Sequence, residues 1–245
     1  MALLASALSS AGPPAQPAEA ADNCLPGQVL NLTNWKLTLP IKNAKEILQP
    51  DLNKYESKYF TDVPPSPDEP PCTSVAFRTP LGGDATSGSS YPRTELREMK
   101  KKGKKLASWS STSGTHEMSW RVAVDVAPVA KPQLVIGQVH DAEDDVVQVL
   151  YDGNDHAINY RWLGETAGHL VSDYGLGTYV DLKIVVKDGT FYLYANGELK
   201  ATQSRSTSGL YFKAGNYSQS NPSKGDDPDL VTQVRISQLS VSHGG

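Results

Sequence analysis

Apolar and polar residues alternate along several short stretches of this chain. Large apolar side chains occupy every second position in residues 118–126, and residues 181–187 repeat the pattern. A period of two is typical of a β-strand that buries one face. An Asp-Gly pair at 188–189 and an Asn-Gly pair at 196–197 then follow, and such pairs favour the tight turns of β-hairpins. The pattern predicts antiparallel strands joined by short turns.

Helical periodicity is almost absent from the chain. Ala44–Leu48 is the best short helix candidate, and Val231–Val241 is predicted to form a final strand. Residues 62–71 are rich in proline and are expected to form a loop, because proline fits neither a helix interior nor a central strand. No internal repeat or linker interrupts the rest of the chain. We therefore predict a single all-β domain over residues 21–245, an antiparallel sandwich or jelly roll.

Composition narrows the class of protein. The chain has 245 residues, of which 38% are hydrophobic and 20% are charged, which indicates a globular protein. Its formal net charge of −4 argues against a basic nucleic-acid binder. No run of about 18 apolar residues predicts a membrane-spanning helix. We expect a monomer that binds neither nucleic acid nor a membrane.

The beginning of the chain predicts export from the cell. Residues 1–20 contain a short apolar stretch and then alanines in an Ala-x-Ala-like spacing, which resembles a secretory signal or pro-segment. Cys24 and Cys72 are the only cysteines, and one pair in a secreted protein predicts one disulfide. Two buried free thiols are the alternative. We expect a secreted, extracellular protein with a Cys24–Cys72 bond.

Two segments place charged and polar side chains where a strand is expected. In residues 91–99 the period of two puts Arg93, Glu95 and Arg97 on one face. Each guanidinium group is planar and can donate two parallel hydrogen bonds, which suits carboxylate ligands. In residues 134–141 Gln138 and His140 share a face at the end of an apolar run. Taken alone, each segment also fits an ordinary solvated strand face or strand end.

A third segment, residues 210–219, combines phenol and ammonium groups. Its polar face carries Tyr211, Lys213, Tyr217 and Gln219. Gly215 lies between them, and we interpret it as room for a ligand to approach the backbone. The glycosylation sequon at Asn216 is predicted to be unused, because its side chain should point to the core side of this strand.

The three segments together resemble a known family. RTELRE, QVH and YFKAGNYSQ match, in order and spacing, the signature segments of the alginate lyases of polysaccharide lyase family 7, and NWKLTLP resembles that family's first core strand. The resemblance implies a β-jelly roll of two curved antiparallel sheets with a cleft on the concave sheet. It implies a catalytic set of Arg93, Gln138, His140 and Tyr217. It also implies cleft residues that bind substrate, namely Glu95, Arg97, Lys213 and Gln219.

The implied activity is cleavage of alginate by β-elimination at its 4-linked uronates, which leaves 4,5-unsaturated oligosaccharides. The enzyme must neutralise the sugar carboxylate with preorganised donors while a base removes the proton on carbon 5. Arg93 and Gln138 supply such donors, and the scheme needs no metal or cofactor. The valine of QVH is associated in the family with mannuronate preference.

Two other functions remain open from the sequence. The chain could be a lyase for another polyuronate, such as glucuronan, on the same fold, or a non-catalytic lectin-like module that binds acidic glycans. The lysine run at residues 100–105 could attract a polyanion, although it also fits a solvated hairpin tip. The acidic loop at residues 141–145 matches the spacing of no calcium loop.

Overall fold

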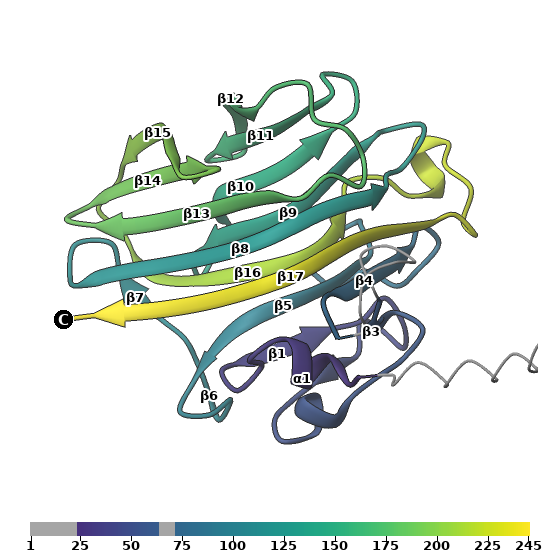
Figure 1. Cartoon of the computed structure of the whole chain (residues 1–245), viewed down its shortest axis with the longest axis horizontal. Coiled ribbons are helices and arrows are strands. Elements are labelled where there is room, and N and C mark those ends of the chain that lie inside the picture. Colours follow the sequence, from purple (N-terminus) through teal and green to yellow (C-terminus); the bar gives the residue numbers. More distant parts are fainter. Residues whose placement is uncertain (1–23, 64–71) are drawn as a thin grey trace, which may run out of the picture.

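The computed structural model describes residues 24–63 and 72–245. These residues form two antiparallel sheets, which we name sheets A and B (Figure 1). In spatial order, the main path of sheet A is β12 (Glu165–Val171), β11 (Ala157–Trp162), β10 (Asp145–Asp152), β9 (Gln133–His140), β16 (Ser208–Ser218), β5 (Arg93–Lys100), β1 (Trp35–Thr38) and β2 (Glu46–Ile47). Two short strands join its side, β6 (Lys105–Leu106) on β5 and β7 (Trp109–Ser110) on β16.

Sheet B lies against one face of sheet A. Its order is β15 (Glu198–Ser204), β14 (Thr190–Ala195), β13 (Val180–Lys187), β8 (Thr115–Val126), β17 (Val231–Gly244), β4 (Val75–Pro80) and β3 (Phe60–Asp62). The helical elements of the described chain are α1 (Pro26–Val29) and the 3-10 turns η1 (Asp51–Lys54) and η2 (Pro222–Lys224). The predicted all-β jelly roll with very little helix is confirmed. None of the described helices is long and apolar enough to span a membrane.

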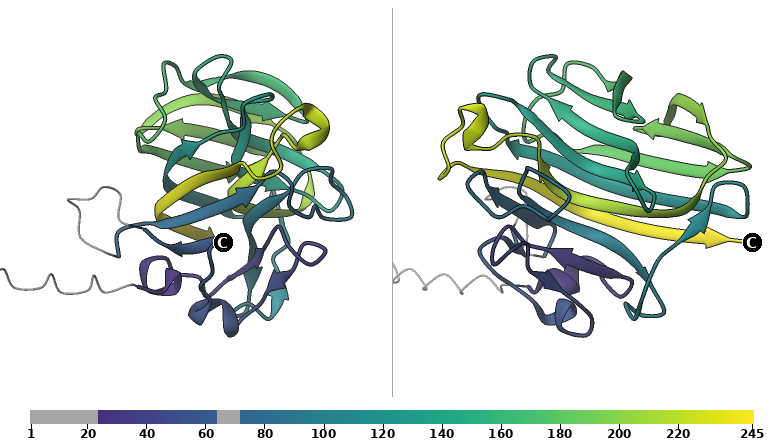
Figure 2. Two further views of the ribbon diagram at one scale, coloured as in Figure 1. Left: turned by 90° about the vertical axis from the view of Figure 1, so that its right-hand side faces the viewer. Right: turned by 180° about the vertical axis from the view of Figure 1, so that it is seen from behind.

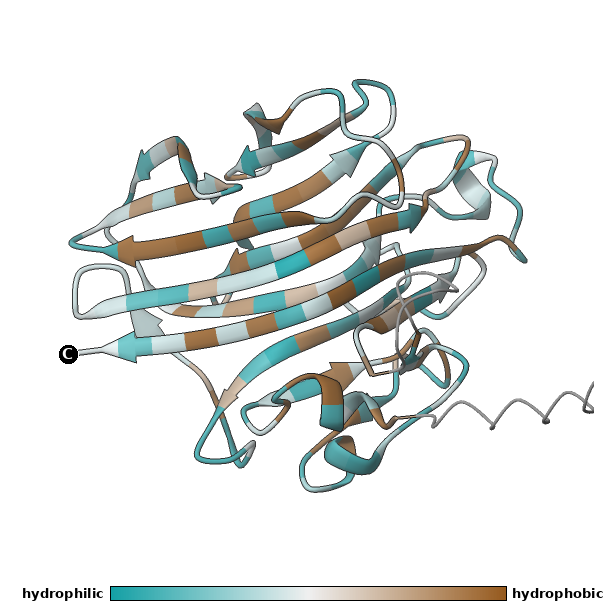
Figure 3. Cartoon of the chain, in the orientation of Figure 1, coloured by the Kyte–Doolittle hydropathy of each residue, from teal (hydrophilic) through white to brown (hydrophobic). Residues whose placement is uncertain are grey.

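The core lies between the two curved sheets, which Figures 1 and 2 show stacked face to face. Figure 3 shows hydrophilic and hydrophobic residues alternating along the long strands, as the period-two pattern predicts. Phe77 from sheet B and Phe212 from sheet A are fully buried between the sheets. Alternate side chains of a strand point to opposite faces of its sheet. The residues on either side of each core residue therefore point away from the other sheet.

Both predicted hairpin turns are present. Asp188 and Gly189 have φ angles of 51° and 75° and connect β13 to β14. Asn196 and Gly197 have φ angles of 50° and 82° and connect β14 to β15. Two consecutive left-handed residues match the twist of the flanking strands, which is why Asp-Gly and Asn-Gly pairs stand at these positions.

The predicted helix at Ala44–Leu48 is wrong. Lys42, Asn43 and Ala44 all have left-handed φ angles, between 51° and 61°, which no right-handed helix contains. The chain turns there and returns as β2, whose Glu46 and Ile47 pair with β1. Pairing with β1 therefore gives this segment the structure of a short edge strand. A helix here would have no repeating apolar face to stabilise it.

The predicted disulfide is confirmed. Cys24 and Cys72 are bonded across a sequence separation of 48 residues. The bond joins the beginning of the described chain to the segment that leads into β4. The predicted signal segment, residues 1–20, and most of the proline-rich loop, residues 64–71, lie outside the described residues.

Candidate active site

The three segments singled out in the sequence are neighbouring strands of sheet A. β16 lies between β9 and β5 and pairs with both. Its Lys213 is the Cα partner of Gln138 on one side and of Arg97 on the other. On the same strand, Tyr211 is opposite His140, and Tyr217 is opposite Arg93. Segments far apart in the sequence are thereby brought side by side.

The candidate site residues on these strands point away from sheet B, whereas Asn216 shows which residues point toward it. Asn216, which precedes Tyr217, is fully buried, and its side-chain amide donates to the carbonyl oxygen of Phe77 at 2.9 Å and to Thr232 Oγ1 at 3.0 Å. Both partners belong to sheet B, so Asn216 points to the core as predicted. Tyr217 therefore lies on the outer side of sheet A. We name the outer side of β9, β16 and β5 the active face.

Glu95 is the centre of the polar network on the active face. The side chain is 2% exposed, and Lys213 Nζ lies 2.6 Å from its Oε2. Arg93 Nη1 donates to the same oxygen at 3.2 Å, and Gln138 Nε2 donates to Oε1. Burial alone would raise the pKa of Glu95, but the charges of Lys213 and Arg93 hold it below its usual range. Glu95 is therefore a carboxylate that orients three donors.

The active face keeps a surplus of positive charge around Glu95. Two cations, Arg93 and Lys213, pair with the single carboxylate of Glu95, and Arg97 lies opposite Lys213 on the neighbouring strand. Arg93 Nε is buried and has no acceptor among the described residues. A buried donor without a partner is costly, so this group is suited to an anionic ligand that brings an acceptor.

Tyr217 lies near two cations and a serine hydroxyl. The guanidinium carbon of Arg93 lies 3.6 Å from the ring centroid, and Lys213 Nζ lies 5.8 Å from it. The phenol oxygen is 3.0 Å from Ser89 Oγ, in the loop that leads into β5. The hydroxyl is thus fixed at the edge of the active face, beside two cations.

The contacts of His140 fix the tautomer of its ring. Its Nδ1 lies 2.7 Å from the carbonyl oxygen of Asp141, which can only accept, so Nδ1 carries the hydrogen. The neutral ring then has its lone pair on Nε2. Burial lowers the pKa of His140, which keeps the ring neutral near pH 7. Tyr211 stacks on the ring at 5.3 Å between centroids, and its hydroxyl is 3.1 Å from Nδ1.

Arg97 supports this arrangement from the neighbouring strand. Its guanidinium carbon is 3.9 Å from the Tyr211 ring centroid, and its Nη1 donates to the carbonyl oxygen of Glu98 at 2.6 Å. The stacked series of Arg97, Tyr211 and His140 restricts how the imidazole can rotate. Tyr211 was noted in the sequence only as part of a polar strand face, and its contact with His140 needs the register of β16 and β9.

Gln219 belongs to a second group of polar residues, centred on Arg161 of β11. Arg161 Nη1 lies 3.3 Å from Gln219 Oε1 and 3.2 Å from Gln148 Oε1, and Nη2 lies 2.9 Å from Gln133 Oε1. No described carboxylate forms an ion pair with Arg161. Arg161 could not be identified from the sequence, because its place beside the site depends on β10, whose Gln148 lies between Arg161 and Gln138.

Gly215 corrects one sequence interpretation. A Cβ at this position would lie 2.6 Å from the carbonyl oxygen of Thr94 and 2.9 Å from Glu95 Cα. Its φ of +143° is also unfavourable for other residues. The absence of a side chain therefore lets β16 approach the backbone of β5, and it does not provide room for a ligand.

We predict that Gly215→Ala destabilises the protein by about 1–3 kcal/mol or more, because it adds both steric overlap and backbone strain. A thermal melt should show a lower Tm together with lost activity, since β16 and β5 both carry site residues. Gly88→Ala is the control, because a Cβ there meets nothing within 4 Å. Equal melting temperatures for the two variants would contradict this explanation of Gly215.

Two other sequence features lie outside the network. The lysines of residues 100–105 form the exposed turn between β5 and β6. In the acidic loop, Asp141 Oδ1 accepts from the backbone amides of Glu143 and Asp144, so one of its oxygens is already used. Among the described residues, the group of candidate metal ligands that lie close together is Asp62 with Cys24 and Cys72, whose sulfurs form the disulfide.

The active face combines a neutral imidazole, a phenol and a set of fixed cations. Cations beside a carboxylate ligand can stabilise negative charge that develops on it when a neighbouring carbon loses a proton. The imidazole and the phenol are the groups able to take up and return a proton. Proton abstraction next to a carboxylate is therefore the chemistry that these residues fit.

Comparisons with known proteins found similar sequences and structures among the alginate lyases. A family model described as alginate lyase matches residues 30–243. The alginate lyase AlgAT5 from polysaccharide lyase family 7 has a similar structure, with 46% sequence identity and a TM-score of 0.85 over 91% of this chain and 100% of the other. A Corynebacterium alginate lyase has 40% identity and a TM-score of 0.83 over 92% and 100% of the two chains.

A third similar structure contains a ligand. It is a doubly substituted variant of alginate lyase A1-II′ in complex with a substrate written GGMG, with 28% identity and a TM-score of 0.75 over 92% of this chain and 97% of the other. The comparison with curated proteins gave no match.

Proposed function

This chain belongs to the alginate lyases of polysaccharide lyase family 7, and from that premise we propose that it favours mannuronate-rich alginate and acts outside the cell. The coarser activity follows from the family: the protein is a polysaccharide lyase that depolymerises alginate. The observation that supports the proposed mechanism is the convergence of Arg93, Gln138, His140 and Tyr217 on one face of sheet A.

The first task of the site is to neutralise the carboxylate of the sugar that loses its proton. Arg93 offers Nε, which has no other acceptor in the described chain. Gln138 uses one side-chain N–H for Glu95 and keeps a second. Glu95 holds both donors in place. Because its own negative charge would repel the sugar carboxylate, we assign it a positioning role. The negative charge that builds up on the sugar carboxylate then meets donors that need no reorganisation.

Proton transfer in a mannuronate unit can use one residue. The hydrogen on carbon 5 and the oxygen on carbon 4 lie on the same side of this ring. Tyr217, as phenolate, takes the proton from carbon 5, the electron pair forms the double bond between carbons 4 and 5, and the bond from carbon 4 to oxygen breaks. The phenol then returns the proton to the leaving oxygen, so no water is consumed.

In a guluronate unit the two groups lie on opposite sides of the ring. Nε2 of His140 then takes the proton on carbon 5, and Tyr217 protonates the leaving oxygen. The neutral imidazole described above is the form that this route requires. The valine in QVH supports the mannuronate preference through the family association.

Extracellular action is supported by two features of the chain. Residues 1–20 resemble a secretory signal or pro-segment. The Cys24–Cys72 disulfide suits an oxidising compartment.

The proposed preference is tested by parallel digestion of polymannuronate, polyguluronate and glucuronan. The ultraviolet absorbance of the new double bond measures initial rates on each polymer. We expect the highest kcat/KM on polymannuronate, a lower value on polyguluronate and no product from glucuronan. A faster reaction on polyguluronate would refute the mannuronate preference, and glucuronan cleavage at a similar rate would refute specificity for alginate.

We predict that polymer binding weakens above about pH 8. Burial lowers the pKa of Lys213 to about 8, and Arg93 contributes to this shift while Glu95 opposes it. The ammonium is charged below that pH and loses its charge above it. KM should therefore rise with pH, and in the alkaline range the increase should approach about tenfold per pH unit. Lys213→Arg is the control, because a guanidinium stays charged there. An identical alkaline rise in KM for this variant would show that another group titrates.

A further inference from the structure

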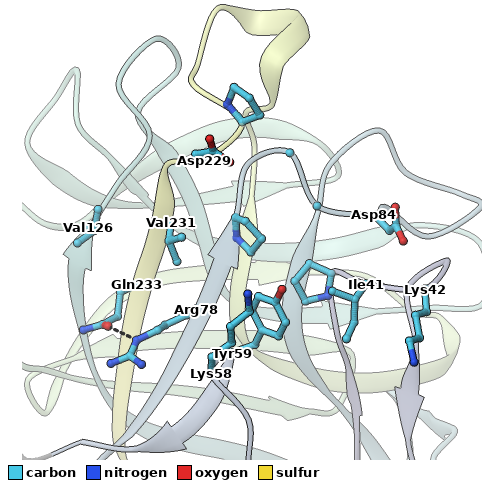
Figure 4. A pocket seen from close by; sticks show the side chains of 15 residues that line it. Ile41, Lys42, Lys58, Tyr59, Arg78, Asp84, Val126, Asp229, Val231 and Gln233 are labelled. Atoms are coloured by element: carbon cyan, nitrogen blue, oxygen red, sulfur yellow. Dashed lines mark hydrogen bonds between the residues drawn. The ribbon is translucent and has the colours of Figure 1, made fainter.

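A pocket of about 790 Å³ lies on the outer side of sheet B, where β3, β4 and the start of β17 meet (Figure 4). None of the residues assigned above to the active face lines it. Its walls include Tyr59 beside β3, Arg78 of β4 and Gln233 of β17. The pocket is therefore separate from the alginate site already described.

Arg78 brings an uncompensated charge to this pocket. The residue is half-buried, and its Nε donates to Gln233 Oε1 at 2.7 Å, a bond drawn in Figure 4. Gln233 in turn donates to Asp125 Oδ2 at 2.8 Å, but that carboxylate is paired with Arg235 at 2.7 Å. No described carboxylate forms an ion pair with Arg78. Its orientation is fixed by an amide, and its terminal nitrogens remain available to an anion.

Lys58 and Tyr59 add a second cation and a phenol. Lys58 Nζ lies 5.0 Å from the Tyr59 ring centroid, and Lys58 forms no ion pair in the described chain. The carbonyl oxygen of Tyr59 accepts from the backbone N–H of Arg78 at 2.8 Å, which ties the two walls together. Figure 4 shows the Tyr59 ring and Lys58 side by side below the middle of the pocket.

Apolar groups complete the walls. Val126 and Val231 are 37% and 40% exposed, and Pro80 and Pro228 lie near them. Apolar side chains that remain in water beside oriented polar groups are typical of binding sites for amphipathic ligands. A pyranose ring is such a ligand, because it has C–H groups on its faces and hydroxyl groups around its edge.

The balance of charge in the pocket favours an acidic ligand. Lys42, Lys58 and Arg78 oppose Asp84 and Asp229 among the lining residues. Asp84 and Lys42 lie on the same wall in Figure 4, and Asp84 Oδ2 already accepts from the backbone amide of Asn43 at 2.8 Å. The wall of Arg78, Lys58 and Tyr59 therefore carries two cations without a described acidic partner.

We propose that this pocket is a second, non-catalytic binding site for uronate sugars, with the sugar carboxylate on Arg78 and Lys58 and the ring against Tyr59 and the valines. The proposal rests on the proposed function, since alginate offers one carboxylate per sugar along a long chain. A polymer segment held here keeps the same chain, or its neighbour, close to the enzyme and raises its local concentration at the active face.

The test uses Tyr217→Phe, which retains the chain while blocking turnover, and a mannuronate oligosaccharide of defined length as titrant. Calorimetry should resolve two binding sites. Adding Arg78→Gln and Lys58→Gln should leave one site. The matched control adds Arg121→Gln and Lys183→Gln, which remove the same charge from the same sheet outside this pocket, and it should keep two sites.

Kinetics with active enzyme gives a second measure. Arg78→Gln with Lys58→Gln should raise KM for long polymannuronate by about tenfold and leave kcat and the cleavage of a short oligosaccharide unchanged. The proposal would be overturned if the pocket variant kept two sites, or if Tyr217→Phe alone showed a single site that the pocket substitutions did not change. Loss of a site in the control variant would also overturn it. If the pocket variant instead abolishes all binding, the pocket stands and the assignment of the active face fails.

Discussion

Tyr217→Phe should abolish the formation of unsaturated product on every alginate polymer. In the proposed mechanism, the phenol is the proton donor in both stereochemical routes and also the base on mannuronate. One general acid or base is worth about 10²–10⁴-fold in rate, so a residue with both roles should cost about 10⁴-fold or more in kcat. Binding should be largely preserved, because the phenyl ring can still stack on Arg93, whose guanidinium lies 3.6 Å from the ring centroid.

The measurement is kcat from ultraviolet absorbance together with oligosaccharide affinity from calorimetry. Tyr91→Phe is the control, because it removes a phenol from the loop before β5 without touching the network around Glu95. Substantial turnover by Tyr217→Phe would overturn the assignment of Tyr217. Loss of affinity in step with kcat would show that the hydroxyl mainly holds the substrate.

His140→Asn should separate the two polymers. Asparagine keeps a donor near the sugar carboxylate but removes the imidazole base. Polyguluronate cleavage should fall by about 10²–10⁴-fold, whereas polymannuronate cleavage should fall far less because Tyr217 supplies the base there. The Asp141 carbonyl oxygen, 2.7 Å from Nδ1, sets the tautomer and leaves the basic lone pair on Nε2.

Initial rates on the two polymers, measured on one protein preparation, give this ratio directly. His156→Asn is a suitable control, since His156 is exposed and has a left-handed φ of 49°, which asparagine accepts readily. Equal losses on both polymers would show that His140 has the same role in each reaction.

Most of the fold could be predicted from the sequence, because the long central strands each bury one face, as β8 and β13 show. The alternation in β8 and β13 and the Asp-Gly turn at 188–189 identify strands and hairpins directly. The helix predicted at Ala44–Leu48 failed for a different reason. β2 is only two residues long and is held by pairing with β1, so no local repeat could reveal it.

Some residues of the candidate site could be predicted from the sequence, and others could not. Arg93, Gln138, His140 and Tyr217 lie in motifs that could be identified in the chain, and the face of β16 followed from its alternation, as the buried Asn216 confirms. Their roles stay predictions. Ser89 and Arg161 were missed, because their positions depend on how a loop folds back and on the register of β10 and β11. Sequence alternation assigns a face to a side chain, but it does not identify the residue beside it on the next strand.

The most direct test of this account is a crystal structure of Tyr217→Phe with a bound mannuronate oligosaccharide. We predict that one sugar carboxylate accepts hydrogen bonds from Arg93 and Gln138, and that the hydrogen on carbon 5 of the same sugar faces the position that the Tyr217 oxygen occupies beside Ser89. An oligosaccharide bound away from the outer side of β9, β16 and β5, or one whose carbon 5 points away from residue 217, would contradict the assignment of this face as the catalytic site.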